Sequence, residues 1–169
     1  MKVGIDPGQN GALAFCYEEK ERIKLFDMPT KKVPWKKAVA VSSICIYSIL
    51  RKHHMPNNAK DRISQINLEL VHAGHKQGVV STFNFGSNFQ AVISAVEIFL
   101  TIRGNHSIPF NFISPQAWKR QHGLISKSKD TARILALKKF PYLKEPLKRK
   151  KDVDRADAIL IALYEKGEK

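Results

Sequence analysis

Hydrophobic residues at the start of the chain alternate with polar or small ones, a pattern typical of β-strands. Residues 2–6 place Val3 and Ile5 on one face, and Pro7-Gly8 then predicts a turn. Similar apolar runs recur twice and predict two more strands, over residues 11–17 and 22–27. The chain is therefore expected to begin as a meander of three antiparallel strands.

The spacing of apolar residues changes after Pro29 and Pro34. Apolar residues then recur every three or four positions, which predicts a helix over residues 36–52. Its expected inner face consists of Val41, Ile44, Cys45 and Ile49. A loop rich in Asn and Asp follows, and residues 66–71 predict a fourth strand.

Helices and strands alternate in the second half. A loop is expected over residues 72–86, then a helix over 89–102 that Gly104 ends, with Val92, Val96, Phe99 and Leu100 facing inward. A fifth strand is expected over 110–114 and a helical turn over 115–120. A helix over 129–140, with Ala132, Leu135 and Ala136 facing inward, is followed by a basic loop at 142–151 and a last helix over 154–165. This order predicts an α/β fold with a mixed five-stranded sheet flanked by helices.

Length and composition narrow the class of protein. A chain of 169 residues that is 43% hydrophobic suits one globular domain, here residues 1–169. No stretch approaches the roughly 20 apolar residues of a membrane span, and the N-terminus does not resemble a signal peptide. The two cysteines, Cys16 and Cys45, lie in apolar contexts and are expected to be reduced core residues of a cytosolic protein.

Charge points to a polyanionic partner. The chain has 29 Lys and Arg against 15 Asp and Glu, a formal net charge of +14. The basic residues are clustered, at Lys31-Lys32 and Lys36-Lys37, at Lys119-Arg120 with Lys127 and Lys129, and at 148–151. Clustered basic charge with a pI near 9.9 is typical of proteins that bind nucleic acids.

Four acidic residues stand out against this basic background. Asp6 ends the first strand, Glu69 interrupts the fourth, and Asp154 and Asp157 lie three apart, so that both project from one face of the last helix. Each also has a structural interpretation: a turn cap for Asp6, an exposed edge-strand position for Glu69, and helix capping for the two aspartates. Asp152 is a further candidate, either as a ligand or as the N-cap.

Carboxylates that meet at one end of a sheet suit divalent cations. Asp157 is followed directly by an apolar run, and a charge at the edge of a buried helix needs a partner such as a cation. Mg²⁺ prefers carboxylate oxygens, water and phosphate, and two such ions can promote phosphodiester hydrolysis. No Cys/His spacing indicates zinc and no Gly-rich loop indicates a nucleotide cofactor. An Asp-x-Gly turn after a first strand also occurs in ATP-binding sugar kinases and actin-like proteins, but those chains are much longer.

The order of these motifs resembles the RuvC family of Holliday-junction resolvases. Gly4-Ile5-Asp6-Pro7-Gly8, a strand glutamate and Asp154-Arg-Ala-Asp157-Ala158 before an apolar helix follow the family pattern. Further motifs resemble the phage and prophage branch, in chain order Phe26-Asp-Met-Pro-Thr30, Glu69-Leu-Val-His-Ala73, Gln77-Gly-Val79, Ser81-Thr-Phe83, Phe85-Gly86, Pro115-Gln-Ala-Trp-Lys119, Gly123-Leu124, Lys129-Asp130 and Phe140-Pro141.

The resemblance implies an RNase H-like fold and a homodimer that nicks four-way DNA junctions in pairs, leaving 5′-phosphate ends. It implies two Mg²⁺ or Mn²⁺ ions per site, held by Asp6, Glu69, Asp154 and Asp157. Lys119 and Lys129 match basic positions near the scissile phosphate, Lys129 in a catalytic role, and Lys127 is expected to bind DNA beside them. The segment 72–86 matches the region that approaches the junction centre, where His72, Phe83 and Phe85 are candidate DNA contacts; core packing is an equal alternative for the two phenylalanines.

The chain also departs from the family pattern. His72 stands where bacterial resolvases often have a stacking aromatic residue, and Gly74-His-Lys76 and Ser87-Asn88 differ from the usual branch sequences. Two other functions therefore stay open: a nuclease of the same fold for forks, flaps or three-way DNA, and a catalytically silent DNA-binding module. The expected location is the cytoplasm of a bacterium or of a phage-infected host. The helix at 86–102 is the best candidate for the dimer contact because it is apolar over more than one face; an ordinary core helix is the alternative.

Overall fold

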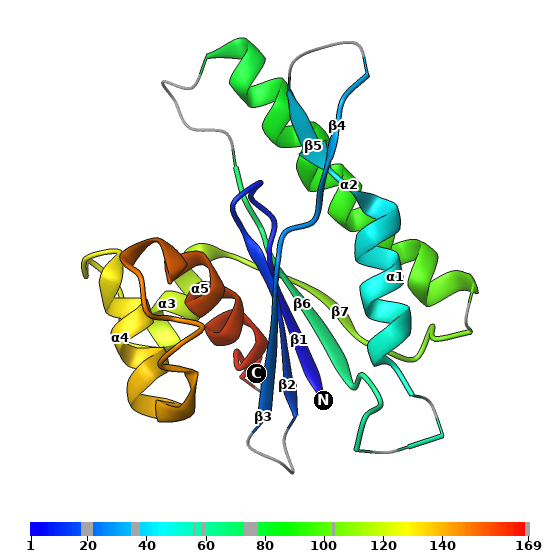
Figure 1. The fold of residues 1–169 in the computed structure, drawn as a ribbon. Helices are drawn as coiled ribbons and strands as arrows, with labels where there is room; N and C mark the ends of the chain where they lie inside the picture. Colours follow the sequence, from blue (N-terminus) through cyan, green and yellow to red (C-terminus); the bar gives the residue numbers. More distant parts are fainter. Residues whose placement is uncertain are drawn as a thin grey trace.

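The computed structural model describes residues 1–17, 22–34, 38–55, 57–58, 60–72, 78–102 and 104–167. Their centre is a mixed five-stranded sheet in the order β3-β2-β1-β6-β7 (Figure 1). The strands are β1 (Lys2–Asp6), β2 (Ala12–Tyr17), β3 (Arg22–Asp27), β6 (Gln65–Glu69) and β7 (Phe110–Ile113). The first three are antiparallel, whereas β6 pairs in parallel with β1 and with β7. The predicted α/β class and mixed five-stranded sheet are confirmed.

Helices flank this sheet on both faces (Figure 1). Helices α1 and α2 cover one face, and α5 covers the other with α3 and α4 beside it. Their bounds are α1 (Ser43–His53), α2 (Val79–Ile102), α3 (Pro115–Gln121), α4 (Asp130–Lys139) and α5 (Val153–Ala162). Two short 3₁₀ turns, η2 (Pro141–Leu143) and η3 (Lys150–Asp152), lie at the two ends of the stretch expected to be a basic loop.

The face under α1 and α2 is packed with large apolar side chains. Strand alternation sends Val3, Ile5, Leu13, Phe15 and Leu68 to this face, where all are fully buried. The predicted inner residues of α2 meet them: Val92, Val96 and Phe99 are buried and Leu100 is partly buried. Burial of this apolar area is the main source of stability on this side of the sheet.

The face under α5 is lined by small side chains instead. Gly4 pairs with Ala14 and Asp6 with Ala12, so these four residues point to the same side. A Cβ on Gly4 would overlap backbone atoms of Ala158 and Ala162 in α5, so the helix lies directly on β1. Glycine is needed here for close approach, and this approach carries the start of α5 to the end of β1.

The helix expected over residues 36–52 begins only at Ser43, which corrects the prediction. The first part forms a second, two-stranded sheet of β4 (Thr30–Lys32) and β5 (Val39–Val41). Val39-Ala-Val41 has the β-branched alternation of a strand, and the buried side chain of Asn88 accepts a hydrogen bond of 2.9 Å from the backbone N–H of Val41. Residues 35–37 lie outside the described residues.

The inner face of α1 also differs from the prediction. Ile46 and Leu50 are buried, whereas Ile44 is 65% exposed and Cys45 is exposed. The helix carries apolar residues on more than one side, so spacing alone could not tell which side packs on the sheet and on α2. Of the two cysteines expected in the core, Cys16 is buried and Cys45 is not.

The loop expected over residues 72–86 is helical from Val79, because α2 runs unbroken from there to Ile102. Gly86 lies within the helix with open space around it, and packing of the later turns outweighs the roughly 1 kcal/mol cost of a helical glycine. Residues 73–77 lie outside the described residues.

Length and composition would allow α2 to cross a membrane, contrary to the expectation from composition. It has 24 residues, of which an 18-residue stretch has a mean hydropathy of 1.4. Its side chains in the core, Val92, Ala95, Val96 and Phe99, account for much of that hydropathy. Core packing accounts for one side of α2, whereas Val79, Val80, Phe83, Ile98 and Ile102 are exposed.

Candidate metal centre

Two of the four predicted acids end neighbouring parallel strands. Asp6 is the last residue of β1 and Glu69 the last of β6. The register that pairs Ile5 with Leu68 places Asp6 level with Glu69, and alternation turns both side chains toward α5. Glu69 is therefore half-buried in the middle of the sheet and is not an exposed edge residue.

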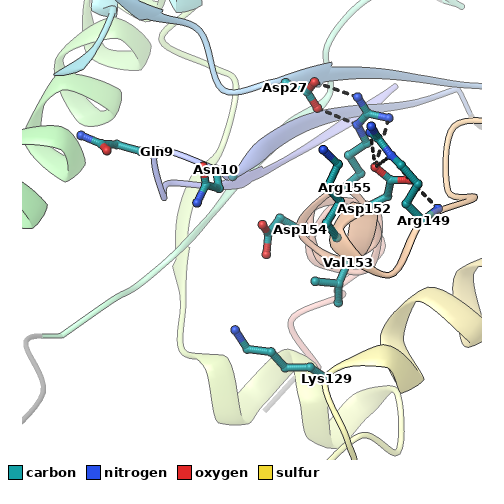
Figure 2. A pocket seen from close by; sticks show the side chains of 11 residues that line it. Gln9, Asn10, Asp27, Lys129, Arg149, Asp152, Val153, Asp154 and Arg155 are labelled. Carbon is teal, nitrogen blue, oxygen red and sulfur yellow. Dashed lines mark hydrogen bonds and ion pairs between the residues drawn. The ribbon is translucent and has the colours of Figure 1, made fainter. Parts of the chain in front are cut away.

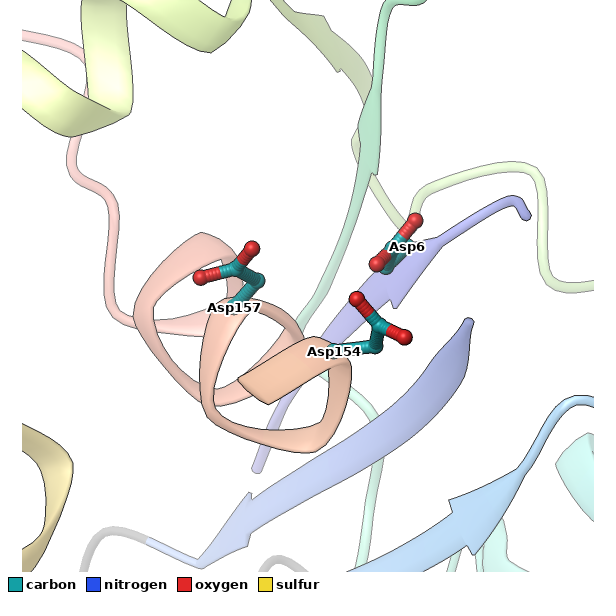
Figure 3. A group of neighbouring side chains, drawn as sticks. All are labelled: Asp6, Asp154 and Asp157. Carbon is teal, nitrogen blue, oxygen red and sulfur yellow. The ribbon is translucent and has the colours of Figure 1, made fainter. Parts of the chain in front are cut away.

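Helix α5 brings the other two acids to the same place. Carboxylate oxygens of Asp6, Asp154 and Asp157 all lie within 4.8 Å of one another. Figure 3 shows Asp154 and Asp157 projecting from α5 toward Asp6 at the end of β1. Residues separated by almost the whole chain thus form one half-buried group of three carboxylates, with Glu69 beside it.

The carboxylates disfavour one another's ionisation. Burial, and then the charge of Glu69, raise the pKa of Asp6 to about 7. Burial, and then the charge of Asp6, raise the pKa of Asp157 to about 8. Burial also raises the pKa of Glu69 and of Asp154. Such a group can be fully ionised at neutral pH only if positive charge is close by.

A tryptophan fixes the glutamate. The indole Nε1 of Trp118, a fully buried residue of α3, donates a 2.8 Å hydrogen bond to Oε1 of Glu69. This bond opposes the burial that raises the pKa of Glu69. Sequence patterns gave Trp118 no role beyond a matching motif; the usable signal was an indole, which needs an acceptor when buried, directly before Lys119.

Two predicted lysines border the acids. The charge of Lys119 opposes the burial that raises the pKa of Asp6, Glu69 and Asp157. The Nζ of Lys119 also lies 5.2 Å from the centre of the Trp118 ring. Lys129 lies just before α4 and acts in the same way on Asp154. Positive charge is therefore present beside the carboxylates from two elements.

The other predicted DNA contacts do not belong to the group of carboxylates and neighbouring lysines. Lys127 is exposed between α3 and α4, and His72 is exposed beyond β6. Phe83 and Phe85 lie on α2, where Phe83 is 72% exposed and does not pack in the core. Phe85 is partly buried and lines a small groove with Pro7, Gly8, Gln9, Ser81 and Asn88.

Asp152 does not join the carboxylate group. It occupies the N-cap position of α5, but its carboxylate accepts hydrogen bonds from the backbone and the guanidinium of Arg149, the shortest at 2.6 Å. These bonds, above all those from the guanidinium, hold the pKa of Asp152 below its usual range. Asp152 is therefore a structural residue of the turn before α5.

The donor set fits Mg²⁺ or Mn²⁺. All the candidate ligands are carboxylates, which hard divalent cations prefer. Their pKa values are raised first by burial and then by their mutual negative charge, and a cation would offset both effects. Oxygens on opposite sides of one Mg²⁺ lie about 4.2 Å apart, given bonds of about 2.1 Å. A limit of 4.8 Å is thus close to the spacing that an ion needs.

No protein-family model and no curated protein sequence matches this chain. Solved structures do. Thermus thermophilus RuvC in complex with a Holliday junction substrate has a TM-score of 0.54 at 16% identity, over 95% of this chain and 89% of that one. Another Thermus thermophilus RuvC structure has a TM-score of 0.54 at 19% identity, over 95% and 90%. The yeast mitochondrial Holliday junction resolvase Ydc2 has a TM-score of 0.50 at 15% identity, over 95% and 76%. The chain therefore has the RNase H-like fold of the RuvC resolvases.

Proposed function

We propose that this protein is a Mg²⁺-dependent endodeoxyribonuclease that resolves four-way DNA junctions by paired symmetric nicks. The observation that carries the proposal is the group formed by Asp6, Asp154 and Asp157, whose oxygens lie within 4.8 Å of one another beside Glu69. A strongly basic chain around an acidic site suits a polyanionic substrate cut at one place. The RuvC-like fold supports the same reaction class.

The acids and the lysines have different tasks in this proposal. Asp6, Asp157, Asp154 and Glu69 would hold one or two Mg²⁺ or Mn²⁺ ions, which supply the charge that activates a water and stabilises the leaving oxygen. Trp118 keeps Glu69 oriented through its indole N–H. The phosphorus–O3′ bond breaks, the water oxygen stays on phosphorus and a proton passes to O3′. The products carry a 5′-phosphate and a 3′-hydroxyl.

Lys119 and Lys129 attract the scissile phosphate to the acids. Both lie close enough for their charge to act on the carboxylates, so they can also offset the negative charge of an entering phosphodiester. We assign Lys129 a catalytic role and Lys119 a binding role. Lys127, His72, Phe83 and Phe85 are proposed to contact DNA farther from the cut, with Phe83 exposed enough to stack on a base.

Paired nicks require two sites, and we propose a homodimer. Helix α2 supplies the surface that favours it: Val79, Val80, Ile98 and Ile102 are large exposed apolar residues on this one helix. Scattered exposed residues are ordinary, but several on one helix suit a protein interface. The protein with both Ile98→Asp and Ile102→Asp in α2 should sediment as a monomer. A dimer of unchanged stability would place the contact elsewhere.

We also propose an origin and a location for the protein from its sequence motifs. We propose a single nuclease domain over residues 1–169 that belongs to the phage and prophage branch of resolvases. The segments Phe26–Thr30 and Glu69–Val71 support this branch. A protein of this branch acts on DNA in the cytoplasm of a bacterium or an infected host, in recombination, repair or phage DNA processing.

Cleavage of defined substrates tests the function. The protein should nick a mobile four-way junction at symmetric positions in the presence of Mg²⁺, and EDTA should stop the reaction. Three-way, forked, flapped and linear duplexes of the same sequence complete the set. Preferred cutting of forks or flaps would assign the branched-DNA nuclease instead, and binding without cutting under any divalent cation would leave the DNA-binding module.

Asp6→Asn separates the chemistry from DNA binding. The substitution removes the negative charge of one carboxylate ligand and removes no basic residue. Nicking should therefore fall by about 1000-fold or more, while junction affinity changes little. Full nicking by this variant would remove Asp6 from the site. Junction affinity of the wild type should fall steeply between about 50 and 200 mM salt, because phosphate contacts release counterions.

A further inference from the structure

A cleft of about 460 Å³ opens directly beside the carboxylate group (Figure 2). It lies between the turn that joins β1 to β2 and the first turn of α5. Its lining comprises Gln9, Asn10, Gly11, Asp27, Lys129, Arg149, Lys151, Asp152, Val153, Asp154 and Arg155. Asp154 belongs both to this cleft and to the candidate metal centre, so the cleft borders that centre.

Two of the acids in this cleft are already neutralised by arginines. Asp27 accepts hydrogen bonds of 2.6 and 2.7 Å from Arg155, which also donates to the carbonyl of Pro146. Asp152 accepts from Arg149, with its shortest bond at 2.6 Å. Figure 2 shows these pairs together on one wall. The charges within each pair largely cancel.

Two lysines keep their charge for a ligand. Lys129 and Lys151 are exposed, and neither takes part in an ion pair of the described residues. In Figure 2, Lys129 lies on the opposite side of the cleft from the paired wall, with Asp154 between them. Gln9 and Asn10 supply amide groups from the β1–β2 turn. The cleft therefore presents positive charge and hydrogen-bond donors next to the acids.

We propose that this cleft binds the backbone phosphates of the nicked strand on one side of the scissile phosphodiester, with Lys151 as a phosphate contact. The inference deepens the proposed function and rests on it. Cations and amides at the mouth of a cutting site suit a phosphate that enters together with the scissile one. No aromatic ring lines the cleft among the described residues, so it suits the backbone of a strand and not a stacked base.

The proposed phosphate contact is independent of base sequence. Lysine recognises phosphate as a point charge and carries no base information by itself. The network that joins β3, η3 and α5 holds the lip of the cleft in one place relative to Asp154. A strand that lies in the cleft is therefore set in register with the acids whatever its sequence.

Phosphate-by-phosphate coupling tests the inference. Junction binding is measured in the Asp6→Asn background, with a single uncharged methylphosphonate at each of three phosphates on either side of the mapped nick. Lys151→Ala should weaken binding of the unmodified junction about fivefold and reduce the salt slope by about 1. At one or two positions on one side of the nick, the methylphosphonate should weaken junction binding about fivefold for the protein that keeps Lys151. At the same positions it should leave the binding of the Lys151→Ala protein unchanged.

Lys52→Ala is the matched control. Lys52 is an exposed lysine at the end of α1, on the opposite face of the sheet from α5. Its removal should give losses that add to those of the methylphosphonate at every position. Additive losses for Lys151→Ala at all six positions would overturn the inference while wild-type nicking still supports the proposed function. A wild-type protein that never nicks would remove both.

Discussion

The two faces of the central sheet carry side chains of different size and polarity. Under α1 and α2 the strands present large apolar side chains such as Ile5, Phe15 and Leu68, all fully buried. Under α5 the same strands present Gly4 and alanines, and then carboxylates at their ends. One strand, β1, supplies both sets in strict alternation, so each of its residues serves one face or the other.

This difference separates stability from chemistry. Large side chains bury apolar area, and the face that carries them can hold the fold without any charged group. Small side chains let α5 come close, and closeness brings Asp157 and Asp154 to Asp6. Asn67, fully buried on this face, ties the end of α5 to β6 by donating to the carbonyls of Ile161 and Tyr164. Substitutions on the two faces should therefore fail in different ways.

The largest effect is expected on the apolar face. Phe99→Ala removes a fully buried ring of α2 and should lower the free energy of unfolding by about 3–5 kcal/mol, measured by urea denaturation. The Mn²⁺ affinity of this variant is measured at 10 °C, below its unfolding transition, so that the folded protein is the species that binds. That affinity should equal the wild-type value, and a tenfold loss would mean that the two faces are coupled.

The substitution of glycine by alanine should change the free energy of unfolding in opposite directions at two positions. Gly4→Ala places a methyl group against the backbone of α5 and should cost about 3 kcal/mol in the free energy of unfolding, together with metal affinity. Gly86→Ala in α2 meets open space and should stabilise the protein by about 0.5–1 kcal/mol. Equal effects at both positions would contradict the close approach of α5 to β1.

The acid face should respond to pH and Mg²⁺ together. Because the folded-state pKa values of Asp6 and Asp157 are raised from 3.8 to about 7 and about 8, the stability from their protonated forms is present in full below about pH 4 and is lost progressively as pH rises to those folded-state values. At pH 8.5, Mg²⁺ at about 100 times its Kd should restore about 2–3 kcal/mol, or about 5–10 °C in Tm.

The same addition at pH 5.5 should change Tm little, because protons occupy the carboxylates. The Mg²⁺-induced shift is compared within each pH, so that the titration of His53 and His122, whose pKa values are lowered mainly by burial, largely cancels. Asp6→Asn combined with Asp157→Asn serves as the control and should show no shift at either pH. A shift of equal size at pH 5.5 and 8.5 in the wild type would exclude these carboxylates as the ligands.

The smallest effect is expected at Trp118. Trp118→Phe keeps most of the buried ring but removes the donor to Glu69, so Mn²⁺ affinity should fall about tenfold, as for other residues that orient metal ligands. Stability should fall by only about 1 kcal/mol. Unchanged affinity, read by calorimetry, would show that Glu69 needs no support from α3.

The order of predicted strands and helices was enough to predict the mixed sheet, and the i, i+3 spacing placed Asp154 and Asp157 on one face of α5, whereas the grouping of the four acids was expected from the family resemblance. Their convergence depends on contacts between distant segments, and Gly4 in particular gave no sign of its packing against α5. The start of α2 was not predictable, because Gly86 is typical of a loop and only the packing of later turns makes it helical. Helix α1 had two apolar sides, and Ile46 was chosen over Ile44 by tertiary contacts.

The central claim is that Asp6, Asp154 and Asp157 form one divalent-cation site at the junction of β1 and α5. Crystals of the wild-type protein grown with Mn²⁺, measured at a wavelength where manganese scatters anomalously, test it directly. One or two anomalous peaks should lie about 2.2 Å from oxygens of these three carboxylates, and the Asp6→Asn protein should lose them or bind more weakly. Occupied manganese elsewhere with none between these aspartates would contradict the account.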